Sequence, residues 1–212
     1  DHKKIGEGDT GLNTGGMGAY SPVPFIKQSQ INDFVTKFAK PIINNLKYNN
    51  IFFSGVFYAG LILTKDGPKL LEINVRFGDP EVQAVLPRLK TDLLDLLLAS
   101  SKGKLDQLKP PEWDNNFCMN VVIASKGYPE SYKKNTIING LNKITTNKSH
   151  YIFHSSTKKN EDHWLATGGR VLSISALGST LKEARNEAYN VINEIDWKNG
   201  YFRKDIGWKH LT

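Results

Sequence analysis

Three polar residues in one short segment have the types and spacing of a site for a metal ion and a phosphate. In the segment 71–81, LEINVRFGDPE, the residues Glu72, Asn74 and Arg76 follow one another at intervals of two. Alternate side chains of a β-strand point to the same face, so a strand here would present all three together. Carboxylate and amide oxygens suit Mg²⁺, and a guanidinium can bind a phosphate through two N–H groups. The alternative is the polar, solvent-exposed face of an antiparallel strand, which alternation alone does not exclude.

The segment 6–18, GEGDTGLNTGGMG, is a second candidate because it is rich in glycine. Such a density of glycine predicts a loop rather than a helix or a strand, since each glycine raises the entropy lost on ordering. The backbone N–H groups of such a loop can surround an anion. The alternative is an ordinary turn that binds nothing.

The elements that must position these segments follow from hydrophobic periodicity. Apolar residues recur every three or four positions over 31–46, which predicts a helix that Pro41 ends or kinks near Lys40. Two apolar runs, 55–63 and 68–75, flank Thr64-Lys65-Asp66-Gly67 and predict a β-hairpin, and 92–101 reads as an amphipathic helix.

A proline-containing joint around Pro110 and Pro111 predicts a domain boundary after residue 108. Beyond it, the residues 117–125, 136–140, 150–155 and 169–176 read as short strands. Thr180 and Glu183 have the spacing of a capping box, which predicts a helix from there to about residue 195. The fold class expected from these elements is α+β.

Composition excludes several classes of protein. The 212 residues are 39% hydrophobic and 23% charged, as in a globular protein in water, and no apolar run reaches the length of a membrane span. The net charge of +7 favours an anionic partner. The basic residues are scattered, however, which argues against nucleic acid and leaves phosphorylated small molecules. Cys118 stands alone, so no internal disulfide can form, and the start at Asp1 is not typical of a signal peptide.

The quoted motifs resemble the phosphoribosylamine–glycine ligase family of the ATP-grasp superfamily. The resemblance rests on LEINVRFGDPE preceded by GVFYAGLIL, on the opening DHKKIGEGDTGLNTGGMGAYSP, and on TGGRVLSISALG and FRKDIGW further along. It covers essentially the whole chain, but only the C-terminal half of a family member. It implies that residues 1–108 form the C-terminal part of an ATP-grasp core, an antiparallel sheet with helices. Residues 109–212 would then form a small α+β C-terminal domain.

The resemblance implies an activity and its partners. Family members join glycine to 5-phosphoribosylamine in purine biosynthesis, with ATP giving ADP and phosphate through a glycyl phosphate intermediate. The expected cofactor is Mg²⁺ or Mn²⁺, and the expected partner is the N-terminal half of the same enzyme, without which this part would be inactive. A cytoplasmic location is implied, with neither nucleic acid nor a membrane as a partner.

The resemblance also implies roles for individual residues. Glu72 and Asn74 would bind the metal ion, and Arg76 would be catalytic, steadying the transferred phosphoryl group or the glycine carboxylate. The expected substrate-binding residues are Asp9, Thr10, Asn13, Thr14, Gly15, Gly16, Gly18, Asp79 and Glu81. The candidates for binding the ribonucleotide phosphate are Arg170, Arg203 and Lys204. For Asp79 the alternative is a turn residue bonded to its own backbone, for Glu81 an acid in the first turn of a helix, and for the cations plain surface charge.

Two other functions remain possible at this stage. One is an ATP-grasp carboxylase or a ligase for another amino acid, against which the segments RFGDPE and NTGGMG argue. The other is a basic domain that binds ribonucleotides or polyanions without turning them over.

Overall fold

The computed structural model describes residues 1–145, 147–161 and 163–211, and the chain divides into two compact units. The first, here called the sheet unit, combines residues 1–22, 79–88 and 114–212. The second, here called the hairpin unit, combines 23–78 and 89–113. Both units are therefore discontinuous in sequence. The predicted boundary after residue 108 separates two domains of a protein family. The division into these two compact units does not test it, so it stays a prediction.

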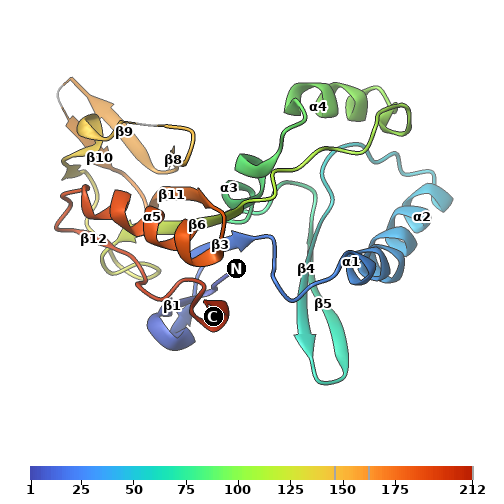
Figure 1. Ribbon diagram of the computed structural model, residues 1–212, viewed down its shortest axis with the longest axis horizontal. Helices are drawn as coiled ribbons and strands as arrows, with labels where there is room; N and C mark the ends of the chain where they lie inside the picture. Colours follow the sequence, from blue (N-terminus) through green and yellow to red (C-terminus); the bar gives the residue numbers. More distant parts are fainter. Residues whose placement is uncertain (146, 162, 212) are drawn as a thin grey trace. The chain divides into compact units, whose positions relative to one another are not determined.

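The sheet unit is built around two long antiparallel strands, β6 (Phe117–Ser125) and β11 (Arg170–Gly178) (Figure 1). The far edge of β11 pairs with β8 (His150–His154). The far edge of β6 pairs with β3 (Gly18–Ser21) and β12 (Gly200–Tyr201). The predicted strand 117–125 is confirmed. Its nearly continuous apolar run, FCMNVVIAS, is almost entirely buried, as expected for a central strand covered on both faces.

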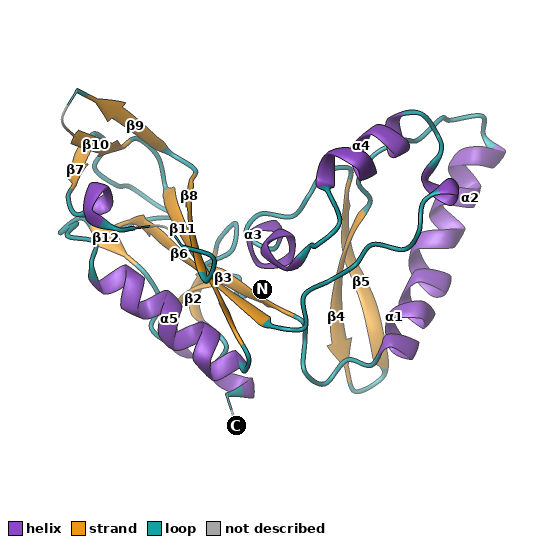
Figure 2. Ribbon diagram, turned by 45° about the horizontal axis from the view of Figure 1, so that its top comes forward, coloured by secondary structure: helices purple, strands orange, loops and turns teal. Residues whose placement is uncertain are grey.

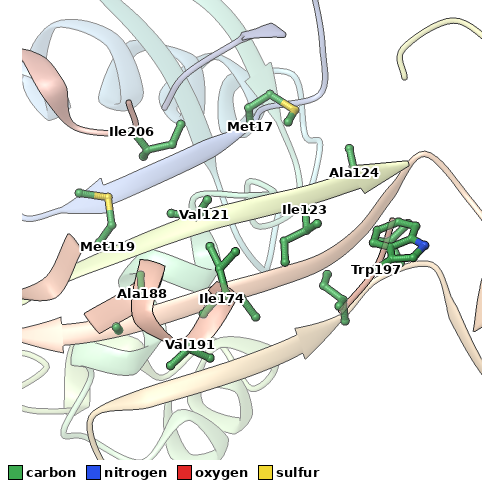
Figure 3. Packing of buried hydrophobic residues seen from close by; sticks show 14 of the residues in the cluster. Met17, Met119, Val121, Ile123, Ala124, Ile174, Ala188, Val191, Trp197 and Ile206 are labelled. Atoms are coloured by element: carbon green, nitrogen blue, oxygen red, sulfur yellow. The ribbon is translucent and has the colours of Figure 1, made fainter. Parts of the chain in front are cut away.

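Helix α5 (Leu181–Asn193) packs along β6 and β11 (Figure 2). Its predicted N-cap is confirmed, because the Thr180 hydroxyl accepts the backbone N–H of Glu183. Ala188 and Val191 of the helix belong to the same buried cluster as Val121 of β6 and Ile174 of β11 (Figure 3). The short helix α3 (Val82–Val85) contacts β3, β6 and β11 of this sheet.

A second antiparallel sheet in this unit has the order β7 (Thr136–Ile138), β10 (His163–Ala166), β9 (Thr157–Asn160). The sequence analysis predicts a strand at β7 but none at β9 or β10. The reason is that β9 reads Thr-Lys-Lys-Asn and is mostly exposed, so it carries no apolar alternation.

The glycine-rich segment contains strands, contrary to the prediction that it would hold none. Strands β1 (Lys4–Gly6) and β2 (Thr10–Asn13) pair as a small antiparallel ribbon. Gly8 has φ of 66° in the connecting turn, a conformation that glycine adopts readily, so this residue allows the chain to reverse direction. The high glycine content correctly indicates turns, but on its own it gives no sign of the two short strands.

The hairpin unit contains the predicted β-hairpin. Strands β4 (Tyr58–Thr64) and β5 (Gly67–Asn74) pair antiparallel as a two-stranded sheet, with Gly67 at φ of 95° after the turn. The predicted helix at 92–101 is confirmed as α4 (Leu93–Ser101), for which the carboxylate of Asp92 accepts the N–H of Leu94 at 2.8 Å.

Pro41 does not end the helical path, but the regular α-helix is interrupted just before it. Helix α1 (Gln28–Phe34) passes through a π-helical turn at Val35–Ala39 into α2 (Lys40–Tyr48). Proline therefore falls in the first turn of α2, and the wider turn just before it accommodates the ring. Short 3-10 turns occur at Glu7–Asp9, Leu86–Arg88, Leu105–Gln107, Leu141–Lys143 and Trp208–His210. Within the described ranges, no helix combines the length and apolarity needed to cross a membrane.

Candidate active site

Glu72 and Asn74 lie on β5 of the hairpin unit, opposite Gly60 and Tyr58 of β4. They are two residues apart in one strand and therefore share a face. A Cβ at Gly60 would lie 2.8 Å from Cγ of Glu72, so the glycine leaves room for the carboxylate side chain. Glu72 is exposed and Asn74 half-buried. Their oxygens fit a hard divalent cation that completes its shell with water and phosphate. Among the described residues, no group of three or more His, Cys, Asp or Glu could hold a metal.

Arg76 does not share this strand face, because β5 ends at Asn74 and residues 75–76 form a bend. The ladder stops there because β4 begins only at Tyr58, after Gly55 with φ of 129°. The predicted strand 55–63 started three residues too early, and the predicted alignment of three side chains holds for two. The Nη1 atom of Arg76 donates to the carbonyl of Phe77 at 2.8 Å, and the side chain is exposed.

Most of the predicted substrate loop is fastened to the sheet unit. The hydroxyl of Thr14 donates to the carbonyl of Lys3 at 2.7 Å and accepts the N–H of Gly16 at 2.9 Å. Gly16 is buried with φ of 117°, and a Cβ there would lie 2.3 Å from Cδ of Pro80. At Gly18 a Cβ would lie 2.7 Å from a backbone oxygen of β6. These glycines are required for close packing, and their role toward a substrate stays a prediction.

Asp79 and Arg170 meet in the sheet unit although 91 positions separate them in sequence. The Nη1 atom of Arg170 donates to the backbone carbonyl of Asp79 at 2.8 Å, to its carboxylate at 3.0 Å and to the carbonyl of Gly15 at 3.0 Å. The Nε and Nη2 atoms of Arg170 make no hydrogen bond with any residue that the structure describes. One edge of the guanidinium is thus fixed, while the other can still donate.

A cavity of about 690 Å³ in the sheet unit is lined in part by Asp79 and Arg170. Its wall also includes hydroxyl and imidazole groups, from Tyr128, His154, Ser155 and Ser156. Sequence reasoning missed these four residues, because in a single sequence nothing sets them apart from other polar residues in loops or at strand ends.

Two side chains of the cavity wall have defined surroundings. The ring of His154 lies against that of Trp164, tilted by 31° and with ring centroids 4.2 Å apart, and burial lowers the pKa of His154 below the ordinary value, so the ring is neutral at pH 7. The hydroxyl of Tyr128 accepts the N–H of Gly15 at 3.0 Å, which ties this wall to the glycine-rich loop.

Asp9 and Arg203 belong to a separate, buried cluster. Arg203 is 0% exposed; it donates to both carboxylate oxygens of Asp205 at 2.8 and 2.9 Å, and to Asp9 and the carbonyl of Lys4 at 3.0 Å each. Lys209 binds the other carboxylate oxygen of Asp9, and this hydrogen bond, more than any other cause, lowers the pKa of that carboxyl. The fold therefore gives Arg203 four protein acceptors and no exposed surface.

The remaining predicted residues of the sheet unit are exposed, except for the half-buried Glu81. Thr10 and Asn13 are exposed on β2, and the hydroxyl of Thr10 donates to the carbonyl of Glu7 at 2.9 Å. Glu81 is the residue preceding α3, with a carboxylate oxygen 3.9 Å from Nζ of Lys3. Lys204 is exposed, and its backbone N–H donates to the carboxylate of Glu7 at 3.2 Å.

Comparison with known families places the chain. The model described as "Phosphoribosylglycinamide synthetase, ATP-grasp (A) domain" matches residues 1–82. The model described as "Phosphoribosylglycinamide synthetase, C domain" matches residues 118–209. Among solved structures, the biotin carboxylase domain of Hydrogenobacter thermophilus 2-oxoglutarate carboxylase has a TM-score of 0.62 at 12% identity. The match covers 87% of this chain and 40% of that one, which is a likeness of fold alone. The match to the ATP-grasp domain model places the chain in the ATP-grasp class.

Closer relatives narrow this class to one family. Phosphoribosylamine–glycine ligase of Agrobacterium fabrum is 44% identical over 212 residues, which are 100% of this chain and 49% of the relative. That of Caldanaerobacter subterraneus is 47% identical over 97% of this chain and 48% of the relative. The crystal structure of phosphoribosylamine–glycine ligase from Thermotoga maritima matches with a TM-score of 0.81 at 30% identity, over 97% of this chain and 50% of that one.

The chain belongs to the phosphoribosylglycinamide synthetase family. This membership confirms both the resemblance and the α+β fold class inferred from the sequence. The chain spans about half the length of the curated relatives it matches.

Proposed function

We propose that this chain takes part in the ATP-dependent ligation of glycine to 5-phosphoribosylamine, giving glycinamide ribonucleotide, ADP and phosphate through glycyl phosphate. The observation that carries the proposal is the match to both the A and the C domain of phosphoribosylglycinamide synthetases, over residues 1–82 and 118–209. The reaction brings a carboxylate to a triphosphate, so the main physical difficulty is the repulsion of negative charges, which cations in a preorganised site offset.

Glu72 and Asn74 would hold the divalent cation, Mg²⁺ or Mn²⁺, that such a reaction needs. The chemistry of the donor set supports this assignment: one carboxylate and one amide oxygen on a single strand face, with Gly60 opposite. When bound, the cation supplies charge neutralisation at the phosphates. The two side chains contribute by fixing its position on a hydrogen-bonded ladder rather than on a loop.

Arg76 would orient the glycine carboxylate or the phosphoryl group. Among the described residues its exposed guanidinium makes one hydrogen bond, from Nη1 to the carbonyl of Phe77, so its other N–H groups are available for a planar, two-oxygen partner. Asp79 would accept a hydrogen bond from an amine, since its carboxylate lies on the cavity wall.

The proposed partner is the N-terminal half of the enzyme, supplied by the same polypeptide or by a separate one. The hairpin unit supports this, because β4 and β5 form a two-stranded sheet, an arrangement that is marginal in water. Leu71 and Val75 are 67% and 73% exposed there, and Leu94 of α4 is 61% exposed. So many exposed large apolar residues in one small unit indicate a surface that another segment covers.

The test is a reconstitution assay in which the proposed metal ligand Glu72 is replaced. ADP release that depends on both glycine and 5-phosphoribosylamine is expected only when this chain and the N-terminal half are present together. Glu72→Ala should lower the rate by a factor of about 10³ or more and weaken Mn²⁺ binding, because it removes the charged ligand.

The control is Asp66→Asn, which removes a carboxylate from the turn of the same hairpin without touching the proposed ligands. It should leave rate and metal binding unchanged. Turnover without glycine, or an unaffected rate in Glu72→Ala, would overturn the proposal.

A further inference from the structure

Two Asn-Gly pairs occur in the sequence, Asn139-Gly140 and Asn199-Gly200, and the fold treats them differently. An asparagine followed by glycine is open to deamidation, because glycine has no side chain to hinder attack by its own backbone nitrogen. We propose that Asn139 is a site of spontaneous deamidation in the folded protein, whereas Asn199 is protected. This modification site is independent of the proposed function, since none of its residues belongs to the candidate active site.

The reaction takes place between the two residues of one pair. The backbone nitrogen of Gly140 attacks Cγ of Asn139 and loses its proton, the Cγ–Nδ2 bond breaks, and ammonia leaves with that proton. A cyclic succinimide remains. Water then adds to one of the two ring carbonyls and opens the ring, which leaves either aspartate or its isomer, in which the chain continues through the side-chain carbonyl. Water is the sole co-reactant, and nothing is oxidised or reduced.

The surroundings of the two asparagine side chains are similar. Both residues line one cavity of about 450 Å³ in the sheet unit, so water can reach both. Asn139 is exposed and Asn199 half-buried. Neither side-chain amide forms a hydrogen bond with a residue that the structure describes, so neither is held away from its glycine. The two pairs therefore differ mainly at the attacking nitrogen.

The nitrogen of the following glycine separates the two pairs. The N–H of Gly200 donates to the carbonyl of Trp197 at 2.9 Å, and Gly200 pairs with Ser125 as part of β12. Within the described ranges, the N–H of Gly140 donates to no acceptor. A bonded N–H must leave its acceptor before the nitrogen can lose a proton and attack. The attacking nitrogen is therefore free at Gly140 and occupied at Gly200.

The backbone of each asparagine must also be able to move. Asn139 forms an isolated antiparallel bridge with Asp196, through two hydrogen bonds of 3.0 and 3.1 Å. A bridge without a ladder beyond it opens locally at low cost. Gly200 instead belongs to a strand that pairs with β6 in the main sheet, so freeing its nitrogen disrupts an edge of that sheet. Local opening therefore also favours reaction at Asn139.

The product would place two carboxylates opposite each other. Directly paired residues of an antiparallel bridge have side chains on the same face, where like charges are destabilising. Aspartate at position 139 would face Asp196, and Lys133 and Lys198, which line the same cavity, offset part of the repulsion. The isomer lengthens the backbone and breaks the register of the bridge. Deamidation therefore loosens the contact between the end of β7 and the segment that follows α5.

The experiment follows deamidation in the 212-residue chain at mildly alkaline pH, by peptide mapping with mass spectrometry. We expect the peptide that contains Asn139 to convert at least about 10-fold faster than the one that contains Asn199, since an additional hydrogen bond must open at Asn199. The same chain unfolded in urea is the reference. There both peptides should convert at similar rates, because the fold no longer distinguishes their glycine nitrogens.

Asn139→Gln and Asn199→Gln are the matched variants, because glutamine reacts only through a larger, less favourable ring. Asn139→Gln should remove most of the ammonia that the folded chain releases early, and Asn199→Gln should change it little. If either variant fails to fold, the two peptides of the original chain still decide. Conversion of Asn199 as fast as Asn139 would contradict the proposal. So would the same preference for Asn139 in the unfolded chain, since the local sequence and not the fold would then be its cause.

The variant Asn139→Asp measures the effect of the product on the bridge. Its melting temperature should lie below that of the original chain, and adding Asp196→Asn should restore part of the loss by removing the opposing charge. An unchanged melting temperature in Asn139→Asp, or no recovery in the double variant, would refute the repulsion across the bridge.

Discussion

Replacing Arg203 by methionine tests whether this arginine is a structural residue or a ligand-binding one. Methionine has a similar length and no charge, so Arg203→Met leaves the carboxylates of Asp9 and Asp205 without their shared cation. The guanidinium makes four hydrogen bonds, three of them to carboxylates, and is 0% exposed. Removing one partner of a buried ion pair costs about 3–5 kcal/mol, because the charge left behind is neither solvated nor paired.

The expected loss lies at the lower end of that range. The side chains of Asp9 and Asp205 are 31% and 18% exposed, so water can partly replace the arginine, and Lys209 still binds Asp9. We therefore expect Arg203→Met to lower the free energy of unfolding by about 3 kcal/mol. With an m-value of about 2 kcal/mol/M, the urea midpoint falls by about 1.5 M. Arg203→Lys should lose about 2 kcal/mol, because an ammonium cannot bond to both oxygens of Asp205 in the same plane.

The assay is urea unfolding at pH 7, followed by circular dichroism, together with the binding of ribose 5-phosphate at about 25 °C. A double-mutant cycle with Asp205→Asn isolates the pairwise part, for which a coupling energy of about 2 kcal/mol is expected. A loss of less than about 1 kcal/mol would refute the argument from burial. So would a stable variant that no longer binds the sugar phosphate, since Arg203 would then be acting on the ligand.

Three further outcomes follow from the sheet unit. Gly16→Ala should destabilise the protein by at least about 2 kcal/mol in thermal unfolding, since φ is 117° and the new Cβ would lie 2.3 Å from Pro80. Gly8 also has a positive φ but open space around it, so Gly8→Ala should cost only about 1 kcal/mol in the same experiment. Burial lowers the pKa of His2 to about 4, below its ordinary 6.5, so the unfolded chain binds the extra proton first as pH falls. Stability is then full above pH 6.5 and declines by about 3 kcal/mol down to pH 4, and His2→Gln should flatten this part of the urea-midpoint profile. Burial raises the pKa of the Cys118 thiol to about 12, so a disulfide reagent at pH 8 should label it only in denaturant; labelling of the native protein would contradict its burial.

Elements with a strong local signal could be predicted from the sequence. The strand at 117–125 has an almost unbroken apolar run, α5 begins at a hydroxyl cap, and the hairpin turns at Asp66 and Gly67. The two strands β9 and β10 could not be predicted. Their residues are polar or mixed, and they are strands because β10 pairs with β7 on one side and with β9 on the other.

The candidate site also contains some features that local sequence signals predict and others that they do not. Glu72 and Asn74 share a strand face as their spacing predicts, because strand alternation is a local property. The position of Arg76 depends on where the ladder ends, and the partner strand begins only at Tyr58, after the bend at Gly55. The meeting of Asp79 with Arg170 spans 91 positions and has no signature in either segment. Long-range contacts of this kind follow from the packing of the whole sheet unit.

The arginines show why residue type alone could not separate structural cations from functional ones. Arg88 uses all three nitrogens on acceptors of its own unit, at 2.7, 2.8 and 3.0 Å. All three nitrogens of Arg203 likewise donate to acceptors of the sheet unit. Arg185 donates to two backbone carbonyls, and its guanidinium lies 4.7 Å from the ring of Tyr189. Toward the described residues, Arg170 uses a single nitrogen, and the residue lines a cavity. An arginine can bind a ligand only with the donors that its own fold leaves over, and by this criterion Arg203 is part of the framework whereas Arg170 retains donors.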